Sequence, residues 1–304
     1  MNPLGGVLPP QATAASHVRY HIAQEIVTLC PPMLGQEVAV TGSVSKGWAD
    51  DSSDIEQIFY VQILPTLQER DTWLHEIGAG EILHDEAPLE DGSIWSTFRF
   101  RDIWVEAGWQ TFNQQEELLS HILMGQILDH HRLILAEVTA HALSLRSEGQ
   151  LSRWQHQLLH YPAVLAHRLV EEATELWKFP HLLTARWTLI DRNEPWRLAE
   201  VLVRELHQLL RVLFAVNHQW EPEWKWIRQT TATLVLKPEH LMERIEAIWT
   251  SEDAAHRIAA CFQLIYDTLA LLPPEYDVLP ALHAIHESIN THPTVYHKIT
   301  PQSE

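Results

Sequence analysis

Residues 38–61 read VAVTGSVSKGWADDSSDIEQIFYV, and this stretch decides how the first half of the chain folds. An apolar run over residues 37–41 ends at Gly42 and Ser43, and a second apolar run covers residues 54–63. Short apolar runs bounded by glycine and aspartate are typical of buried strands. The pattern therefore predicts two strands, joined by a loop that begins with a helical turn.

The segments around these strands alternate between helical and extended patterns. Apolar periodicity predicts helices over residues 16–30, 65–77 and 113–123, and strands over residues 94–100 and 103–112. The resulting order is helix, strand, strand, helix, strand, strand. This order is typical of a small α/β domain built on a mixed sheet.

The second half of the chain is different, because all eleven glycines lie at or before Gly149. Strands and tight turns need glycine far more than helices do. Apolar residues over 198–214 repeat with helical spacing, and prolines interrupt the pattern at helix-length intervals. The sequence thus predicts an α+β protein, with an α/β domain over residues 1–128 and an all-α helical bundle over residues 129–304.

Charge excludes one large class of partner. The 304 residues include 21 Lys and Arg against 40 Asp and Glu, which gives a formal net charge of −19. Nucleic-acid binding needs a basic surface that displaces counterions, so we expect no nucleic-acid partner. The same charge is compatible with a cationic substrate or partner.

Cysteine count and hydropathy exclude further classes. Cys30 and Cys261 are too few for a disulfide framework or for a four-thiolate metal site. No apolar run approaches the roughly 18 residues that a membrane span needs. Residues 1–15 carry no basic residue, unlike a signal or transit peptide. We therefore expect a cytoplasmic protein that does not act at a membrane.

The turn after the first predicted strand has the composition of a phosphate site. Gly42 lets the backbone approach a ligand closely, and Ser43 offers a hydroxyl and a backbone N–H at the start of a helical turn. Lys46 adds a positive charge that a phosphate would attract. A glycine-serine pair before a helical turn is common without any ligand, so this turn alone is weak support for a phosphate site.

Three acidic residues occur on the predicted strands after this turn. Asp54 and Glu56 are two residues apart on one strand, so both side chains point to the same face. Two carboxylates on one face repel each other unless a cation lies between them, and Mg²⁺ binds carboxylate and triphosphate oxygens together. Glu106 lies between apolar residues of a later strand and is the candidate for a third ligand. A solvated strand face is the alternative interpretation.

The order of these motifs resembles that of the nucleotidyltransferase superfamily that includes DNA polymerase β. Within it, the chain is most similar to the kanamycin-type aminoglycoside nucleotidyltransferases. Residues 42–46 resemble their Gly-Ser loop, with Lys46 where that family carries arginine. Residues 53–56, Ser-Asp-Ile-Glu, match their acidic motif, and Glu106 resembles their third metal-binding acid.

The resemblance extends into the second half. Residues 125–129 resemble the linker into the family's helical domain, and residues 170–175 resemble a helix whose last glutamate is the general base. This implies that Glu175 is the base and that Lys178 contacts the substrates. Residues 217–226 resemble a motif of nucleotidyltransferase-like proteins and imply a phosphate contact for Lys225.

The resemblance implies a function. ATP and Mg²⁺ would bind the first domain, with Asp54, Glu56 and Glu106 on the metal and with Gly42, Ser43 and Lys46 on the phosphates. AMP would pass to a hydroxyl of a small cationic acceptor such as an aminoglycoside, and pyrophosphate would leave. The same resemblance implies a homodimer with a site shared between its subunits.

Other interpretations of the sequence stay open. AMP could pass instead to a protein, as in antitoxin-type nucleotidyltransferases, or the chain could be a catalytically silent helical binding protein. Glu171, Glu172 and Glu175 could form a solvated acidic helix face, and Glu171 or Glu172 could be the base in place of Glu175. Lys225 could be a surface lysine that lies over neighbouring tryptophan rings.

Overall fold

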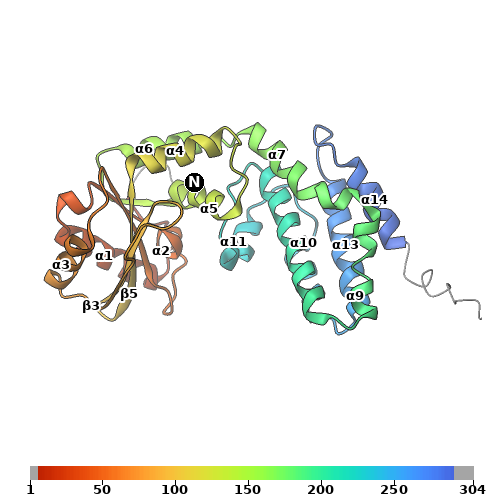
Figure 1. The fold of residues 1–304 in the computed structure, drawn as a ribbon, viewed down its shortest axis with the longest axis horizontal. Coiled ribbons are helices and arrows are strands. Elements are labelled where there is room, and N and C mark those ends of the chain that lie inside the picture. The colour runs from red at the N-terminus through yellow and green to blue at the C-terminus, as the bar shows by residue number, and fades with distance from the viewer. Residues whose placement is uncertain (1–5, 291–304) are drawn as a thin grey trace, which may run out of the picture. The chain divides into compact units, whose positions relative to one another are not determined.

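The computed structural model describes residues 6–290 and divides into two compact units, Met1–His160 and Tyr161–Glu304 (Figure 1). The division lies beyond the boundary that the sequence predicts at residues 128 and 129. The reason is that β6 (Leu143–Arg146), which comes after that boundary, pairs with β1 (Glu37–Val40) and so belongs to the sheet of the first unit.

The first unit is built on a six-stranded mixed sheet in the order β3-β4-β5-β2-β1-β6. Its other strands are β2 (Ile55–Val61), β3 (Gly80–His84), β4 (Ile94–Phe100) and β5 (Ile103–Thr111). The pair β2–β5 is parallel, and every other neighbouring pair is antiparallel. This arrangement confirms the predicted mixed sheet. The sequence does not predict the edge strands β3 and β6, because both are short and neither carries a long apolar run.

Helices cover one face of this sheet more closely than the other. The helices of the first unit are α1 (Ala14–Leu29), α2 (Gly42–Lys46), α3 (Leu67–Glu76), α4 (Phe112–Leu123), α5 (His130–His141) and α6 (Gln150–Leu158), with a 3-10 turn over Pro32–Leu34. Under α1 and α3, Trp109 stacks on Phe59 with ring centroids 5.1 Å apart, and Trp73 meets the same Phe59 edge-on. The opposite face leaves alternate residues of β2 and β4 only partly buried. That more open face carries Glu56 and Glu106.

The second unit is helical, as the absence of glycine predicts. It contains α7 (Ala163–Thr174), α8 (Pro180–Thr184), α9 (Thr188–Asp191), α10 (Pro195–Val216), α11 (Ile227–Ala232), α12 (Leu241–Thr250), α13 (Ala254–Ala270) and α14 (Leu279–Asn290), with 3-10 turns over Glu175–Lys178 and Trp224–Trp226. Residues 161–290 contain no strand. Together with the mixed sheet, this confirms the predicted α+β class.

The predicted apolar stripe over residues 198–214 forms the buried side of α10. Its leucines at 202, 209 and 213 have no exposed surface. The same helix also buries two ion pairs, in which Glu205 pairs with Arg186 and Arg211 pairs with Glu221. Among residues 6–290, no helix has both the length and the hydropathy of a membrane span.

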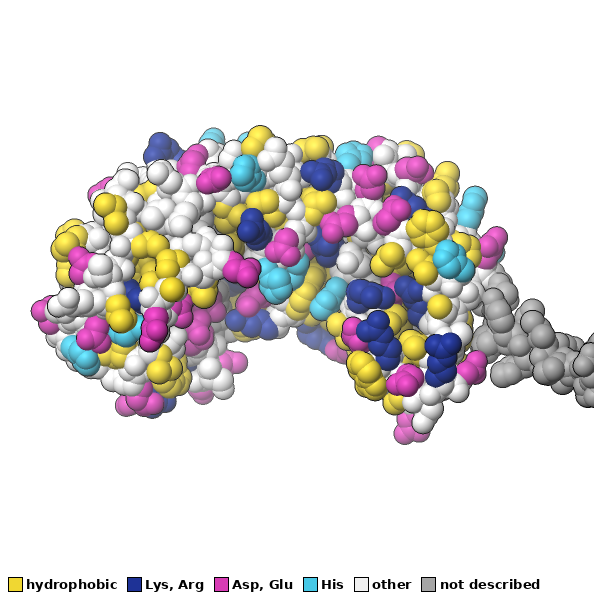
Figure 2. All heavy atoms as spheres, in the orientation of Figure 1, with side chains coloured by type: hydrophobic (Ala, Val, Ile, Leu, Met, Phe, Trp, Pro, Cys, Tyr) yellow, Lys and Arg dark blue, Asp and Glu magenta, His cyan; other side chains and the backbone are white. Residues whose placement is uncertain are grey.

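Acidic side chains are common on the surface (Figure 2), and both cysteines are buried. On the face shown in Figure 2, acidic side chains are spread over both units, and the Lys and Arg side chains of the first unit stand apart from one another. Cys30 and Cys261 are both free and buried. Burial raises the pKa of both thiols, that of Cys30 to about 12, so neither is a reactive thiolate at neutral pH.

A buried carboxylate joins the sheet to α6. Glu37 of β1 has no exposed surface, and its two oxygens accept hydrogen bonds from the backbone N–H groups of Gln150 (2.8 Å) and Leu151 (2.7 Å). Gly149, the N-cap of α6, has no side chain to serve that end of the helix. Glu37 therefore caps α6 from another element, and the positive end of the helix dipole favours its negative charge.

We expect Glu37→Ala to lower the free energy of unfolding of the first unit by about 1–3 kcal/mol, because two buried N–H groups would lose their acceptor. Urea unfolding followed by tryptophan fluorescence measures this loss. Glu117→Ala, on the exposed side of α4, is the matched control and should stay within about 0.5 kcal/mol of the wild type. Equal unfolding midpoints for the two variants would contradict the capping role.

Candidate active site

Three carboxylates meet where β2 and β5 run side by side. Asp54 directly precedes β2, and Glu56 is two residues further along the same face. In the parallel pairing, Glu106 of β5 lies in register with Glu56. Each residue offers a carboxylate oxygen, and these three oxygens all lie within 4.8 Å of one another. The structure thus brings together the three acids that the sequence singled out.

The geometry of the three carboxylates fits a hard divalent cation. All three residues are partly buried, which weakens the screening of their mutual repulsion by water. Oxygen ligands lie about 2.1 Å from Mg²⁺, so two ligands on opposite sides of the ion are about 4.2 Å apart. The observed spread is close to that separation, and small side-chain rotations would close the difference.

Glycine is required at position 42 because the carboxylate of Glu56 lies close to the backbone there. It begins α2 with a φ of +60°, and a Cβ at this position would lie 1.9 Å from Oε2 of Glu56. The backbone N–H of Thr41 donates to the carbonyl oxygen of Glu56 at 2.9 Å, which holds the turn against β2. The sequence predicts that glycine is needed at position 42 so that a ligand can approach the backbone. The structure adds a second reason, because the carboxylate of Glu56 leaves no space for a side chain there.

Ser43 lies in the first turn of α2, as the sequence predicts. The residue is 7% exposed, and its carbonyl oxygen accepts from the backbone N–H of Trp48 at 2.9 Å. This bond folds the chain back after α2 and keeps the turn compact. Gly42 borders the three carboxylates through Glu56. Contact of Gly42 and Ser43 with a phosphate stays a prediction.

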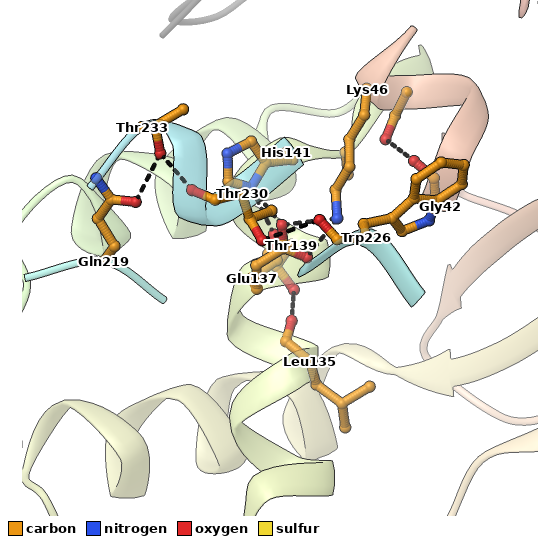
Figure 3. A network of polar contacts seen from close by, with 12 residues as sticks. Gly42, Lys46, Leu135, Glu137, Thr139, His141, Gln219, Trp226, Thr230 and Thr233 are labelled. Atoms are coloured by element: carbon orange, nitrogen blue, oxygen red, sulfur yellow. Dashed lines mark hydrogen bonds and ion pairs between the residues drawn. The ribbon is translucent and has the colours of Figure 1, made fainter. Parts of the chain in front are cut away.

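Lys46 has a partner that the sequence did not predict. Its Nζ lies 2.8 Å from Oε1 of Glu137 on α5, with the two side chains 7% and 5% exposed, and Figure 3 shows the lysine pointing at this carboxylate. Nδ1 of His141 lies 3.2 Å from the same oxygen, and the lysine Nζ is 5.6 Å from the ring centroid of Trp48. The charge of Lys46 is therefore paired within the first unit. Its contact with a phosphate stays a prediction.

Glu137 could have been noticed in the sequence. It is the one acidic residue of the apolar helix LILAEVTA over residues 133–140, and it is buried. An acid among apolar residues was the signal that identified Glu106. The same signal applied to Glu137 indicates a buried partner, although it does not identify Lys46 as that partner.

The remaining predicted residues belong to the second unit. α7 ends at Thr174, and a 3-10 turn starts at Glu175. Glu175 is exposed and lies 2.7 Å from Nζ of Lys178, while Lys225 lies 2.8 Å from Glu223. The roles of these residues toward a substrate stay predictions.

Glu171 and Glu172 are both exposed on α7, and Glu172 lies 3.9 Å from Nη2 of Arg211. An exposed acidic face was the alternative interpretation of this helix. The exposure of Glu171, Glu172 and Glu175 agrees with it.

A cleft of about 490 Å³ opens beside the carboxylates, on the side of β5. It is lined by residues of α1, of the loop before β2, of β3, β4 and β5, and of the turn between β4 and β5: Arg19, Asp51, Ser52, Ser53, Asp54, Leu83, Thr97, Arg99, Asp102, Ile103, Trp104 and Glu106. The guanidinium of Arg99 lies 5.2 Å from the ring centroid of Trp104. The volume is within the range of small-molecule sites, about 300–1,000 Å³. Sequence reasoning did not find Arg19, Arg99 or Thr97, because only the folded sheet brings them beside Asp54.

We expect Gly42→Ala to displace the carboxylate of Glu56 and to weaken Mn²⁺ binding by about tenfold or more, because the new methyl group would overlap Oε2. Titration with Mn²⁺, followed by electron paramagnetic resonance of the free ion, measures this loss. Gly78→Ala is the matched control: Gly78 also has a positive φ, of +76°, but a Cβ there would meet nothing within 4 Å. Equal Mn²⁺ affinity in both variants would contradict the proposed crowding.

We expect Lys46→Met to destabilise the first unit by about 3 kcal/mol, because it would leave the buried carboxylate of Glu137 without its lysine partner. The double variant Lys46→Met, Glu137→Leu should recover most of this loss, since it removes both charges. Urea unfolding of the two variants and the wild type provides the comparison. A double variant as unstable as the single variant would show that the pair is not the source of the stability.

Comparison with known proteins identifies a family model and a solved structure to which the chain is similar. A family model described as "Domain of unknown function (DUF4037)" matches residues 127–227, and no curated protein matches the chain. Among solved structures, the chain is similar to a nucleotidyltransferase-like protein from Exiguobacterium sibiricum 255-15. The two chains are 14% identical with a TM-score of 0.39, and the match covers 91% of this chain and 79% of that chain. At this level the similarity assigns no residue a role, so the function is inferred from the site's own geometry.

Proposed function

We propose that this chain is a Mg²⁺-dependent nucleotidyltransferase of the superfamily that its motifs resemble. The observation that carries the proposal is the meeting of Asp54, Glu56 and Glu106 within 4.8 Å on two parallel strands. The Gly42–Ser43 turn borders Glu56, so a phosphate site and a metal site would adjoin one another. This combination suits the transfer of a nucleotide from a triphosphate better than it suits a simple acidic surface.

The three carboxylates would hold the metal, and the Gly42–Ser43 turn would hold the triphosphate. When bound, Mg²⁺ supplies charge neutralisation at the phosphate oxygens. Asp54, Glu56 and Glu106 would hold the ion and would thereby orient those oxygens. The N–H groups and the hydroxyl of the turn donate to phosphate oxygens and hold the leaving group.

The sheet order supports a separation of the acceptor from the leaving group. β1 and β5 flank β2, so the Gly42–Ser43 turn after β1 and the cleft over β5 lie on opposite sides of Glu56. In-line displacement requires the attacking oxygen and the departing pyrophosphate to lie on opposite sides of the α-phosphorus. The bond from the acceptor oxygen to phosphorus forms as the bond to pyrophosphate breaks. We therefore propose that the acceptor enters through the cleft.

The acceptor hydroxyl loses its proton to a carboxylate. We propose Glu175 as this base, in the same chain or in a second copy of a homodimer, with Glu171 and Glu172 as the alternatives. A base must come within about 3 Å of the hydroxyl, directly or through one water molecule. The resemblance of residues 170–175 to the family's base-bearing helix supports this proposal.

A small cationic acceptor such as an aminoglycoside fits the charge of the chain. The formal net charge is −19, and the cleft includes Asp51 and Asp102 in addition to Asp54 and Glu106. Carboxylates that do not hold the metal would attract the ammonium groups of such an acceptor. We propose that the co-substrate is ATP, whose adenylyl group passes to the acceptor.

The proposal is tested by incubating the protein with Mg²⁺, α-labelled ATP and a panel of aminoglycosides, and by measuring pyrophosphate release and label transfer. Asp54→Asn should lower turnover by more than about a hundredfold, because it weakens a direct metal ligand. Asp277→Asn, at an exposed position of the second unit, should leave turnover unchanged. Glu175→Gln should lower the rate by about 10²–10⁴ and leave binding of MgATP intact.

The outcomes separate the proposal from its competitors. Undiminished turnover in Asp54→Asn would refute the metal site as the catalytic centre. Label found on a protein rather than on a small molecule would indicate a protein acceptor. Absence of both Mn²⁺ binding and pyrophosphate release would favour a binding protein without catalytic activity.

A further inference from the structure

A buried arginine holds the loop that carries Asp54. Arg19 of α1 is 6% exposed, and its guanidinium donates to three backbone carbonyl oxygens. Nε donates to Ser53 at 2.7 Å, and Nη2 donates to Asp51 at 3.0 Å, so two of the three residues before Asp54 are held directly. Nη1 donates to Ala15 at 3.3 Å, within α1 itself. One planar group thus joins the helix to the loop.

The same loop is also held by Thr13, the N-cap of α1, and by Ser16 in the first turn of the helix. Thr13 and Ser16 precede Arg19 at intervals of three residues, so the three lie along one side of the helix start. Oγ1 of Thr13 donates to the carbonyl oxygen of Ala49 at 2.5 Å, and the backbone N–H of Ala49 donates to Oγ of Ser16 at 3.0 Å. The first turns of α1 therefore form a continuous support for the segment from Ala49 to Ser53.

The loop is also closed by its own bonds. Oδ1 of Asp50 accepts from the backbone N–H of Ser52 at 2.9 Å and from Oγ of Ser53 at 3.1 Å. The backbone N–H of Asp50 donates to Oγ of Ser53 at 3.0 Å. These local bonds set the shape of the turn, whereas Arg19 fixes its place relative to the sheet.

The charge of Arg19 is placed where the site needs a positive charge. Among the described residues, no carboxylate forms an ion pair with Arg19, although an unpaired buried charge is normally costly. Its guanidinium lines the same cleft as Asp51, Asp54 and Glu106. Arg19 therefore offsets part of the acidic charge of the cleft while its hydrogen bonds go to the backbone.

We propose that Arg19 is a positioning residue for the metal site: it fixes the backbone of residues 51–53 and thereby the carboxylate of Asp54 beside Glu56 and Glu106. This role rests on the proposed function, since it assumes that Asp54 binds a metal ion. Arg19 does not touch the metal itself. Lysine cannot replace Arg19, because the three carbonyl oxygens are bound by three different nitrogens of one planar guanidinium. The single nitrogen of an ammonium group cannot reach all three.

Two measurements on the full-length protein test the proposal. The first is hydrogen exchange of the backbone amides of residues 50–54 without metal, which should be faster in Arg19→Lys than in the wild type by about tenfold or more. The second is the affinity for Mn²⁺ alone, measured by electron paramagnetic resonance. It should fall by about 10- to 100-fold in Arg19→Lys, the usual effect of losing a partner that supports a metal ligand.

Arg146→Lys is the matched control. Arg146 also donates to three backbone carbonyl oxygens of the first unit, those of Gly35 (2.6 Å), Val27 (2.6 Å) and Cys30 (2.8 Å), but it does not line the cleft. Its substitution should lower the free energy of unfolding to a similar extent and leave both the Mn²⁺ affinity and the exchange of residues 50–54 unchanged. If Arg19→Lys does not fold, Ser16→Ala, which removes one hydroxyl of the same support, replaces it.

Unchanged exchange of residues 50–54 in Arg19→Lys would overturn the proposal. An equal loss of Mn²⁺ affinity in Arg146→Lys would also overturn it, since the effect would then reflect stability alone. If the wild type does not bind Mn²⁺, the proposed function fails, and the exchange measurement still decides whether Arg19 holds the loop. Faster exchange confined to residues 50–54, with weaker Mn²⁺ binding, would support the proposal.

Discussion

The parallel pairing of β2 with β5 places Glu56 directly beside Glu106, and Asp54 joins them from the start of β2. Three partly buried carboxylates at this separation repel one another, and that repulsion opposes the folding of the sheet around them. The apolar layer of Phe59, Trp73 and Trp109 under the other face stabilises the same strands. The first unit therefore keeps an unfavourable arrangement of charges that its apolar layer offsets.

The elements around the three carboxylates leave them little freedom to move apart. The backbone at Gly42 approaches Glu56 so closely that no side chain fits between them. Arg19 holds the loop before Asp54 through backbone carbonyl oxygens, and β4 pairs with β5 on its far side. Each constraint comes from a different part of the chain, so the site is fixed by the fold rather than by local sequence. A rigid scaffold of this kind would reduce the reorganisation needed for the metal binding that we propose.

Four buried glutamates lie away from the three carboxylates, and each of these four has a partner that compensates its charge. In the first unit, Glu37 joins β1 to α6 by capping that helix. Glu137 joins α5 to α2 by pairing with Lys46. In the second unit, Glu205 and Glu221 pair with arginines within the helical core. Removing one partner of such a pair costs more than removing both, because a buried charge without a partner is the least favourable state.

The sequence by itself determined the features that depend on near neighbours along the chain. The absence of glycine after Gly149 predicted the helical second half, and the spacing of Asp54 and Glu56 placed both on one strand face, because strand side chains alternate with a period of two. Tertiary structure alone decided which distant residues meet. The sequence offered Glu106 as a third acid, but only the β2–β5 register brought it beside Glu56. The partner of Lys46, the loop held by Arg19, and the edge strands β3 and β6 were set by contacts between segments far apart in the chain. Such contacts leave no local pattern, because their free energy arises from packing and pairing that exist only once the chain has folded.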